Sequence, residues 1–142
     1  MDVLELSQLS EKVECHFQIT KDTYRLFTEI SGDRNPLHVD EIFAVRKGFA
    51  NCVMYGNILN LYVSYFVGMA LPTPDVMIHA QDINYRKPLF LGDKIKLVSV
   101  VDSVSEAVNV IVYKLKFYRT GTVKDELVAN GHVQVGLLKD LE

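Results

Sequence analysis

The chain has 142 residues, of which 49% are hydrophobic and 23% are charged, as is typical of a globular domain and not of a disordered or proline-rich segment. Fifteen basic residues against 18 acidic ones give a net charge of −3, so the chain lacks the basic excess of proteins that bind nucleic acid. We therefore expect one domain, residues 1–142, with no nucleic-acid partner.

The first 50 residues predict one strand followed by two helices. Residues 13–19 have the composition of a strand, and Thr20 is placed to cap a helix over 21–31, where apolar side chains recur at helical spacing. Pro36 interrupts regular structure after this helix, and a second, short helix is expected over 40–47.

Residues 57–71 carry the most informative pattern in the chain. The segment has helical length and no charged residue, and its polar residues Asn57, Asn60 and Ser64 are spaced so that they line one narrow stripe. A helix that is apolar on nearly all sides must be buried on nearly all sides. The segment is too short to span a membrane, so we expect protein to surround it.

The rest of the chain predicts four long strands rich in Val, Ile and Tyr and joined by short turns, at 76–86, 94–104, 108–119 and 126–138. Consecutive strands with short connections form an antiparallel sheet. One buried helix and a long antiparallel sheet favour an α+β architecture in which the sheet curls around the helix, which is the hot-dog fold.

Asp33 and His38 are the candidate catalytic residues. They lie five residues apart across a loop that contains glycine and proline, so both side chains can point at one spot. A carboxylate and an imidazole together can take, hold and return a proton near neutral pH. The sequence allows a second interpretation, because Asp33 is also suited to an Asx turn and His38 to a surface position.

The same stretch resembles the signature of the MaoC-like (R)-specific enoyl-CoA hydratases and dehydratases, through Gly32, Asp33, Asn35, Pro36, His38 and Ala44. Two further segments are similar to that family. Tyr55 and Gly56, followed by the apolar helix, resemble its His-Gly pair and central helix, and residues 85–93 resemble its Phe-x-x-Pro-Val-x-x-Gly-Asp segment. The resemblance extends over residues 12–102.

The resemblance implies a function for each matching residue. Asp33 and His38 would activate a water that adds to the β-carbon of a trans-2-enoyl thioester, and the reverse reaction would dehydrate an (R)-3-hydroxyacyl thioester. Asn35 would shape the loop, and the N–H of Gly56 would bind the thioester oxygen at the start of the helix. Close packing is the alternative explanation for Gly56.

Two positions depart from the family pattern. Tyr55 stands where the family usually has His, and Leu61 stands where it often has a serine. Ser64 lies on nearly the same helical face as Leu61 and is expected to take over the positioning role of that serine. These departures keep two alternatives open, a thioesterase and a module that binds acyl-CoA without turnover. A thioesterase typically carries a carboxylate on the central helix, which this chain lacks.

We expect no metal and no cofactor beyond the coenzyme A or acyl carrier protein that is part of the substrate. The sequence contains no zinc motif, Gly-rich phosphate loop or Rossmann fingerprint. Four basic residues could meet the phosphates of coenzyme A, the alternative being solvated surface charges: Arg46, Lys47, Arg86 and Lys87.

Strand 76–86 is expected at an open sheet edge, and such edges favour pairing with a second copy, so we predict a homodimer or a higher homo-oligomer. The first residues lack the basic start and apolar run of a signal peptide, and no stretch is long and apolar enough to span a bilayer. We therefore expect a cytoplasmic protein without a membrane partner, in which Cys15 and Cys52 are reduced thiols.

Overall fold

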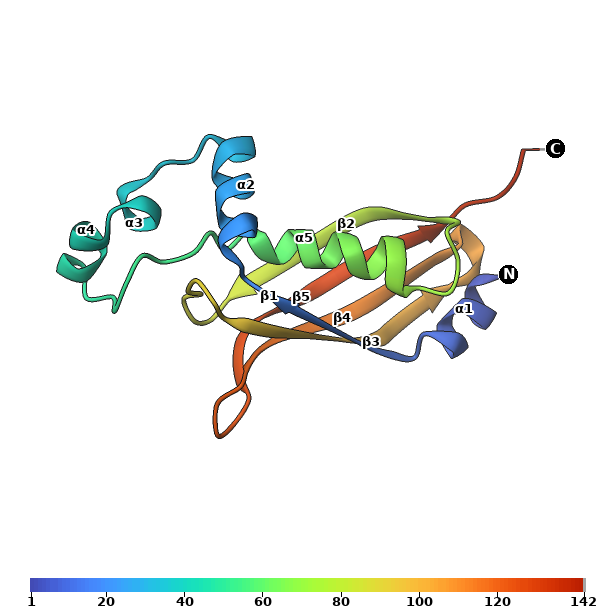
Figure 1. Ribbon diagram of the computed structural model, residues 1–142. Coiled ribbons are helices and arrows are strands. Elements are labelled where there is room, and N and C mark those ends of the chain that lie inside the picture. Colours follow the sequence, from blue (N-terminus) through green and yellow to red (C-terminus); the bar gives the residue numbers. More distant parts are fainter. Residues whose placement is uncertain (142) are drawn as a thin grey trace.

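A five-stranded antiparallel sheet forms the body of the computed structural model, which describes residues 1–141 (Figure 1). Its spatial order is β1-β3-β4-β5-β2. The strand bounds agree within two residues with the sequence-based prediction: β1 Lys12–Gln18, β2 Val76–Tyr85, β3 Lys94–Ser105, β4 Val110–Thr120 and β5 Glu126–Leu137. Strand β2 lies at one edge of the sheet, as predicted, and β1 forms the other edge.

The central helix α5, Ile58–Tyr65, lies against one face of this sheet and is extended by a π-helical turn, Phe66–Ala70 (Figure 1). One side of the helical run is packed into the core, and the ring of Phe66 meets Tyr113 of β4 edge-on at 5.3 Å. The α+β hot-dog arrangement of one helix and one antiparallel sheet is thereby confirmed.

The opposite side of α5 is open, so the expectation of a helix surrounded on nearly all sides is wrong for a single chain. Three large apolar side chains are 46–73% exposed there: Leu61, Tyr65 and Met69. Asn57 and Ser64 of the polar stripe are also exposed. The physical reason is geometric, since five strands cover one face of the helix and no other element of the described chain covers the second face.

The N-terminal helix α1, Val3–Leu9, was not predicted. Asp2 caps it by accepting a hydrogen bond from the N–H of Glu5 at 2.8 Å, and the pair Asp2 and Glu5 has the spacing of a capping box. Leu6 is buried, and the hydroxyl of Ser10 lies 2.7 Å from the buried hydroxyl of Tyr113. This helix therefore seals the end of the core opposite the candidate site (Figure 1).

The segment between helix α2, which spans Lys21–Ser31, and α5 projects beyond the end of the sheet (Figure 1). Helix α2, Lys21–Ser31, begins as predicted at Thr20, whose side chain accepts a hydrogen bond from the N–H of Thr23, and it ends at Gly32 with φ 69°. Two short helices follow, α3 Pro36–Val39 and α4 Glu41–Arg46. Helix α4 was predicted, whereas α3 was expected to be irregular loop.

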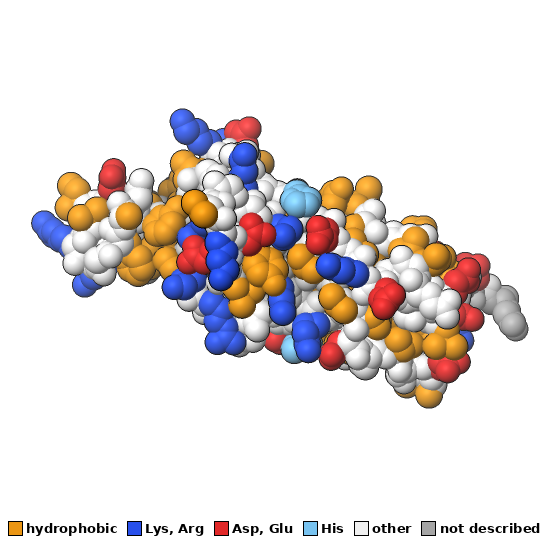
Figure 2. Space-filling view, turned by 90° about the horizontal axis from the view of Figure 1, so that it is seen from below, with side chains coloured by type: hydrophobic (Ala, Val, Ile, Leu, Met, Phe, Trp, Pro, Cys, Tyr) orange, Lys and Arg blue, Asp and Glu red, His pale blue; other side chains and the backbone are white. Residues whose placement is uncertain are grey.

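Basic and acidic side chains are interspersed over the face of the molecule shown in Figure 2. Lys96 of β3 pairs with Asp125 at 2.7 Å, and Lys114 of β4 lies 3.7 Å from Asp102. The pair of Lys114 and Asp102 is exposed, and exposed pairs contribute little to stability.

Tyr62 of α5 offers a test of the core. It is 6% exposed, its ring stacks on Phe17 at 4.1 Å, and its hydroxyl has no hydrogen-bond partner among residues 1–141. Tyr62→Phe is therefore expected to raise the free energy of unfolding at pH 7 by about 1 kcal/mol, because it removes a buried unsatisfied group. Urea denaturation measures this change, and Tyr113→Phe, which loses a buried hydrogen bond, is the opposing control.

The same substitution is expected to reduce sensitivity to alkali. Burial raises the pKa of Tyr62 from 10.0 to about 12. As the pH rises, the tyrosine therefore ionises in the unfolded chain before it ionises in the folded one. The free energy of unfolding keeps its full value below pH 10 and falls by about 3 kcal/mol between pH 10 and pH 12. The prediction would be contradicted if Tyr62→Phe were less stable than the wild type at both pH 7 and pH 11. That result would mean that the Tyr62 hydroxyl has a stabilising hydrogen-bond partner.

Candidate active site

Asp33 is held by a local turn that leaves one carboxylate oxygen free. Its Oδ1 accepts a hydrogen bond from the N–H of Asn35 at 3.0 Å, and its own N–H donates to the hydroxyl of Ser31 at 3.1 Å. The Oδ2 oxygen faces His38 instead. The two readings of Asp33 are therefore compatible, because one oxygen forms the Asx turn and the other belongs to the candidate site.

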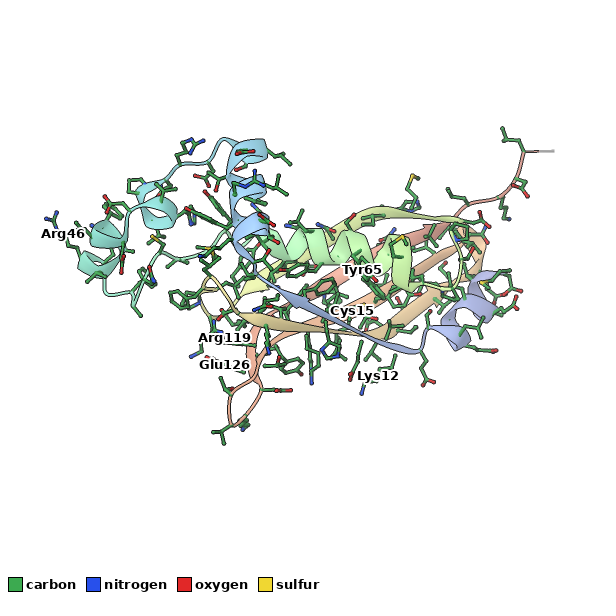
Figure 3. All side chains as sticks on the ribbon, in the orientation of Figure 1. Lys12, Cys15, Arg46, Tyr65, Arg119 and Glu126 are labelled. Atoms are coloured by element: carbon green, nitrogen blue, oxygen red, sulfur yellow. The ribbon has the colours of Figure 1, made fainter. Side chains whose placement is uncertain are left out.

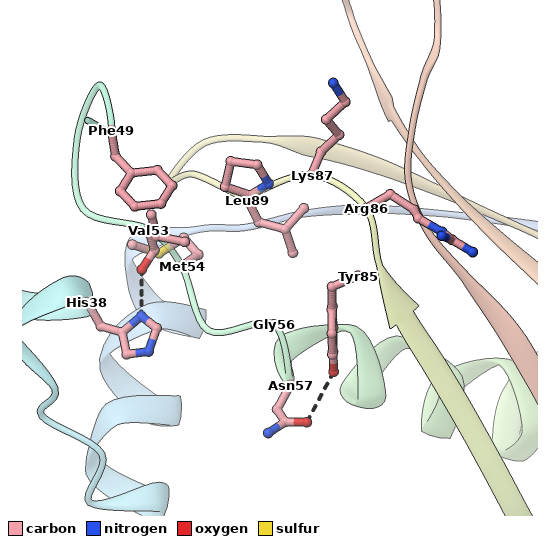
Figure 4. A pocket seen from close by; sticks show the side chains of 11 residues that line it. His38, Phe49, Val53, Met54, Gly56, Asn57, Tyr85, Arg86, Lys87 and Leu89 are labelled. Carbon is pink, nitrogen blue, oxygen red and sulfur yellow. Dashed lines mark hydrogen bonds between the residues drawn. The ribbon is translucent and has the colours of Figure 1, made fainter. Parts of the chain in front are cut away.

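His38 reaches the same point from the short helix α3. Asn35 caps this helix by accepting from the N–H of Leu37 at 3.0 Å, and Pro36 occupies its first turn. The Nδ1 atom of His38 lies 2.7 Å from the carbonyl oxygen of Val53 (Figure 4). A carbonyl only accepts, so Nδ1 carries a proton and Nε2 is the atom directed toward Asp33.

The two candidate catalytic groups are close but not directly bonded. Nε2 of His38 lies 3.7 Å from Oδ2 of Asp33, which is longer than a direct hydrogen bond. The imidazole is 16% exposed and the carboxylate 46% exposed, so the site opens to solvent on the side of Asp33. The hydroxyl of Tyr24 donates to the carbonyl oxygen of His38 at 3.0 Å and further fixes α3.

His38 lines a cleft of about 480 Å³ (Figure 4). Its other lining residues are mainly apolar, with two cations from the segment after β2: Phe49, Val53, Met54, Gly56, Asn57, Tyr85, Arg86, Lys87, Pro88 and Leu89. A cleft of this size that combines an apolar lining with a few polar groups is suited to a small organic ligand.

Gly56 lies in the wall of this cleft, just before α5. Among residues 1–141 no acceptor takes its N–H, so that donor is available to a ligand at the start of the helix. A Cβ atom on Gly56 would lie 2.8 Å from Cε1 of Tyr85. Close packing and an available backbone donor thus coexist at this glycine.

Gly56→Ala is expected to lower kcat/KM roughly 10-fold, equivalent to about 1.4 kcal/mol, because the methyl group displaces the Tyr85 ring within the cleft. Stability should change little, since Tyr85 is 51% exposed and can move. Steady-state kinetics test this expectation, with Gly68→Ala as the control because no atom lies within 4 Å of its added Cβ. Equal kinetics of the two variants would contradict it.

Two other predicted site residues lie outside the cleft. Asn35 stabilises the loop, because its side chain caps α3 and its backbone N–H donates to Asp33. It does not line the cleft. Ser64 is exposed on the open side of α5 and does not line the cleft either. The structure therefore brings Asp33, His38 and Gly56 to one region and does not bring Ser64 there.

Arg119 is a residue of the site region that sequence reasoning missed. Its guanidinium donates to Asp93 Oδ2 at 3.0 Å, to Glu126 Oε2 at 3.1 Å and to the carbonyl oxygen of Pro88. Asp93 Oδ2 also accepts from the N–H of Phe90 at 2.9 Å. These bonds hold the cleft wall after β2 against β4, and Figure 3 shows Arg119 beside Glu126 there.

Cys52 precedes the cleft residue Val53 in sequence, but its surroundings do not activate it. Burial raises the pKa of the Cys52 thiol, and the carboxylates of Glu41 and Asp40 raise it further. A nucleophilic cysteine needs the opposite environment, so Cys52 is not suited to covalent catalysis. Neither Cys52 nor the buried Cys15 forms a disulfide.

This chain belongs to the family described as MaoC like domain, whose model matches residues 7–123. A 3-hydroxybutyryl-CoA dehydratase from Methylorubrum extorquens is 32% identical over 117 residues, which are 82% of this chain and 71% of that protein. An (R)-specific enoyl-CoA hydratase from Aeromonas caviae is 30% identical over 80 residues, or 56% and 60% of the two chains. The family resemblance is therefore confirmed, as is assignment to the lyase class.

The structure is similar to that of an unliganded R-hydratase, PhaJ1 from Pseudomonas aeruginosa. The TM-score is 0.79 with 23% identity, and the match covers 91% of this chain and 81% of the other. This similarity supports the hot-dog fold.

Proposed function

We propose that the chain catalyses reversible hydration of trans-2-enoyl thioesters to (R)-3-hydroxyacyl thioesters. The observation that carries the proposal is the approach of Asp33 Oδ2 to His38 Nε2 at 3.7 Å beside a cleft that also contains the free N–H of Gly56. The names of the curated relatives support the same reaction, since one is a CoA dehydratase and another an enoyl-CoA hydratase.

In this mechanism the pair holds one water molecule. Asp33 Oδ2 and His38 Nε2 are not directly bonded at 3.7 Å, and both can accept, so one water beside them can donate a hydrogen bond to each. The pair accepts one proton from this water as its oxygen bonds to the β-carbon of the substrate. The electron pair of the double bond moves toward the thioester oxygen, which the N–H of Gly56 stabilises.

The proposed reaction needs no reactant besides the enoyl thioester and water. The proton taken from water goes to the α-carbon on the same face, and the thioester carbonyl re-forms. One water is added, no electrons are gained or lost, and the pair returns to its starting state. This balance is why we propose no redox cofactor or metal for the reaction.

The carrier of the acyl group is coenzyme A or an acyl carrier protein in this proposal. Arg86 and Lys87 are exposed and line the cleft, so they are placed to meet phosphate groups. Arg86 also donates to Asn130 at 3.0 Å, and Lys87 lies 3.9 Å from Glu126. Arg46 lies at the outer tip of α4 and does not line the cleft (Figure 3).

A spectrophotometric assay with crotonyl-CoA and a longer 2-enoyl-CoA tests the proposal. Loss of the absorbance of the conjugated thioester without release of free thiol is the expected result. Release of thiol would instead indicate a thioesterase. Binding with neither change would indicate an acyl-binding module, an alternative that the departures at Tyr55 and Leu61 keep open.

The open side of α5 is proposed to pack against a second copy. Apolar side chains of α5 and of the edge strand β2 lie exposed there, including Leu61, Met69 and Met77. An apolar helix face beside an unpaired strand edge is a surface that protein association covers.

No helix in the described part of the chain is long and apolar enough to cross a membrane. A cytoplasmic location stays a prediction.

Light scattering is expected to give at least twice the chain mass of 16.1 kDa at micromolar concentration. Met69→Glu should shift the protein toward the monomer, because it places a charge on a side chain that a partner would bury. Val123→Glu is the matched control, since Val123 is fully exposed in the turn between β4 and β5. A monomeric wild type would contradict the prediction.

A further inference from the structure

Tyr55, which departs from the family pattern, is one of the most constrained side chains near the site. It is 2% exposed, although it directly precedes the cleft residue Gly56. Its hydroxyl donates to the backbone carbonyl of Asp33 at 2.6 Å and lies 2.8 Å from the hydroxyl of Thr28 on α2. Its ring lies 4.2 Å from the imidazole of His38, tilted by 35°.

The chemistry of the two groups identifies the donor. The carbonyl of Asp33 can only accept, so the single proton of the Tyr55 hydroxyl is directed to it. Thr28, whose hydroxyl also lies 2.9 Å from the carbonyl of Tyr24, supplies a further contact from α2. Tyr55 therefore connects α2, the loop at Asp33 and the ring of His38.

We infer that Tyr55 is a positioning residue that sets the separation between Asp33 and His38. The hydroxyl fixes the backbone from which the carboxylate extends, and the ring fixes the plane of the imidazole. Both groups act on one water only if their separation is kept, because reactions of this kind tolerate little displacement of the acting groups. The inference rests on the proposed hydration.

The geometry separates this role from direct catalysis. Tyr55 does not line the cleft, and its hydroxyl points to a backbone carbonyl and to α2. It acts on the reaction through Asp33 and His38. Tyrosine can therefore occupy this position where the family usually has histidine, provided that its hydroxyl reaches Asp33.

The first experiment compares Tyr55→Phe with Tyr113→Phe in the hydration assay. Both substitutions remove the hydroxyl of a buried tyrosine and its hydrogen bond, but Tyr113 bonds to Ser10 at the remote end of the core. Tyr55→Phe is expected to lower kcat between about 10- and 100-fold with little change in KM. Tyr113→Phe should keep wild-type kcat at a temperature where both variants are folded.

The second experiment does not need turnover. Hydrogen exchange at the amide of Asn35, which donates to Asp33, reports how firmly the loop is held. Tyr55→Phe should accelerate this exchange about 10-fold or more, and Tyr113→Phe should not.

The two experiments have distinct outcomes. If the wild type fails to hydrate any enoyl-CoA, the proposed function is overturned, and with it a catalytic reason for the positioning. If the wild type is active and Tyr55→Phe retains wild-type kcat, the positioning role is overturned while the hydration stands. Unchanged exchange at Asn35 in Tyr55→Phe would also overturn the role, whatever the activity of the wild type.

Discussion

Asp33→Asn and His38→Gln should each lower kcat by roughly 10²- to 10⁴-fold, the usual effect of removing a general acid or base. Asn preserves the shape of Asp33 and the oxygen that accepts from the Asn35 N–H, but it cannot take a proton. Gln preserves a hydrogen-bonding group at position 38 but not the imidazole that lies 3.7 Å from Asp33. Hydration of crotonyl-CoA, followed by absorbance, measures both effects.

The double variant should be little slower than either single variant, because in the proposed mechanism the two groups act on one water and their contributions are not additive. KM should change little, since in the proposed complex the N–H of Gly56 and other parts of the cleft bind the thioester oxygen and the carrier. Asp40→Asn is the control for the carboxylate, because Asn can also accept the N–H of Phe43 at the start of α4. An (S)-3-hydroxyacyl product, or wild-type activity of His38→Gln, would contradict the mechanism.

Arg119→Met should lower the free energy of unfolding by about 3 kcal/mol, because it leaves a nearly buried carboxylate without its cation. The side chains of Arg119 and Asp93 are only 17% and 15% exposed, and they meet at 3.0 Å. The substitution also removes the donor to the carbonyl oxygen of Pro88 in the cleft wall. Denaturant unfolding measures the loss, and a parallel increase in KM is expected as the wall loosens.

Lys114→Met is the matched control for Arg119→Met. Lys114 lies 3.7 Å from Asp102, both side chains are more than 40% exposed, and exposed pairs of this kind contribute about 0–1 kcal/mol. Similar losses of stability in the two variants would show that burial does not make the pair of Arg119 and Asp93 more stabilising than an exposed pair.

The sequence predicted the core of the fold because its signals are strong and local. A segment of helical length without a charged residue indicated α5, and long runs of Val, Ile and Tyr indicated the strands. Helix α3 was missed because it has only four residues, of which Pro36 is the first, and so short a segment carries no periodic pattern. The open side of α5 could not be predicted, since an apolar sequence does not distinguish burial within a chain from burial between chains.

The site was predicted in part. The spacing of Asp33 and His38 and the family resemblance together located the pair, and the capping residue Asn35 followed from the same motif. Arg119 could not be predicted, because its partners Asp93 and Pro88 are remote in sequence and meet it only through the pairing of β3 with β4. The contact of Tyr55 with Asp33 likewise joins residues 22 positions apart.

The projecting segment between α2 and α5 places two candidate catalytic residues outside the core. Residues 32–53 carry Asp33 and His38, yet none of them belongs to the main buried cluster, and Ala44 is their one fully buried member. Changes in residues 32–53 would alter the surroundings of the candidate catalytic residues without removing side chains from the main buried cluster. If the proposed hydration is correct, substitutions that change the acyl preference are therefore expected to cost less stability in this segment than in the sheet or α5.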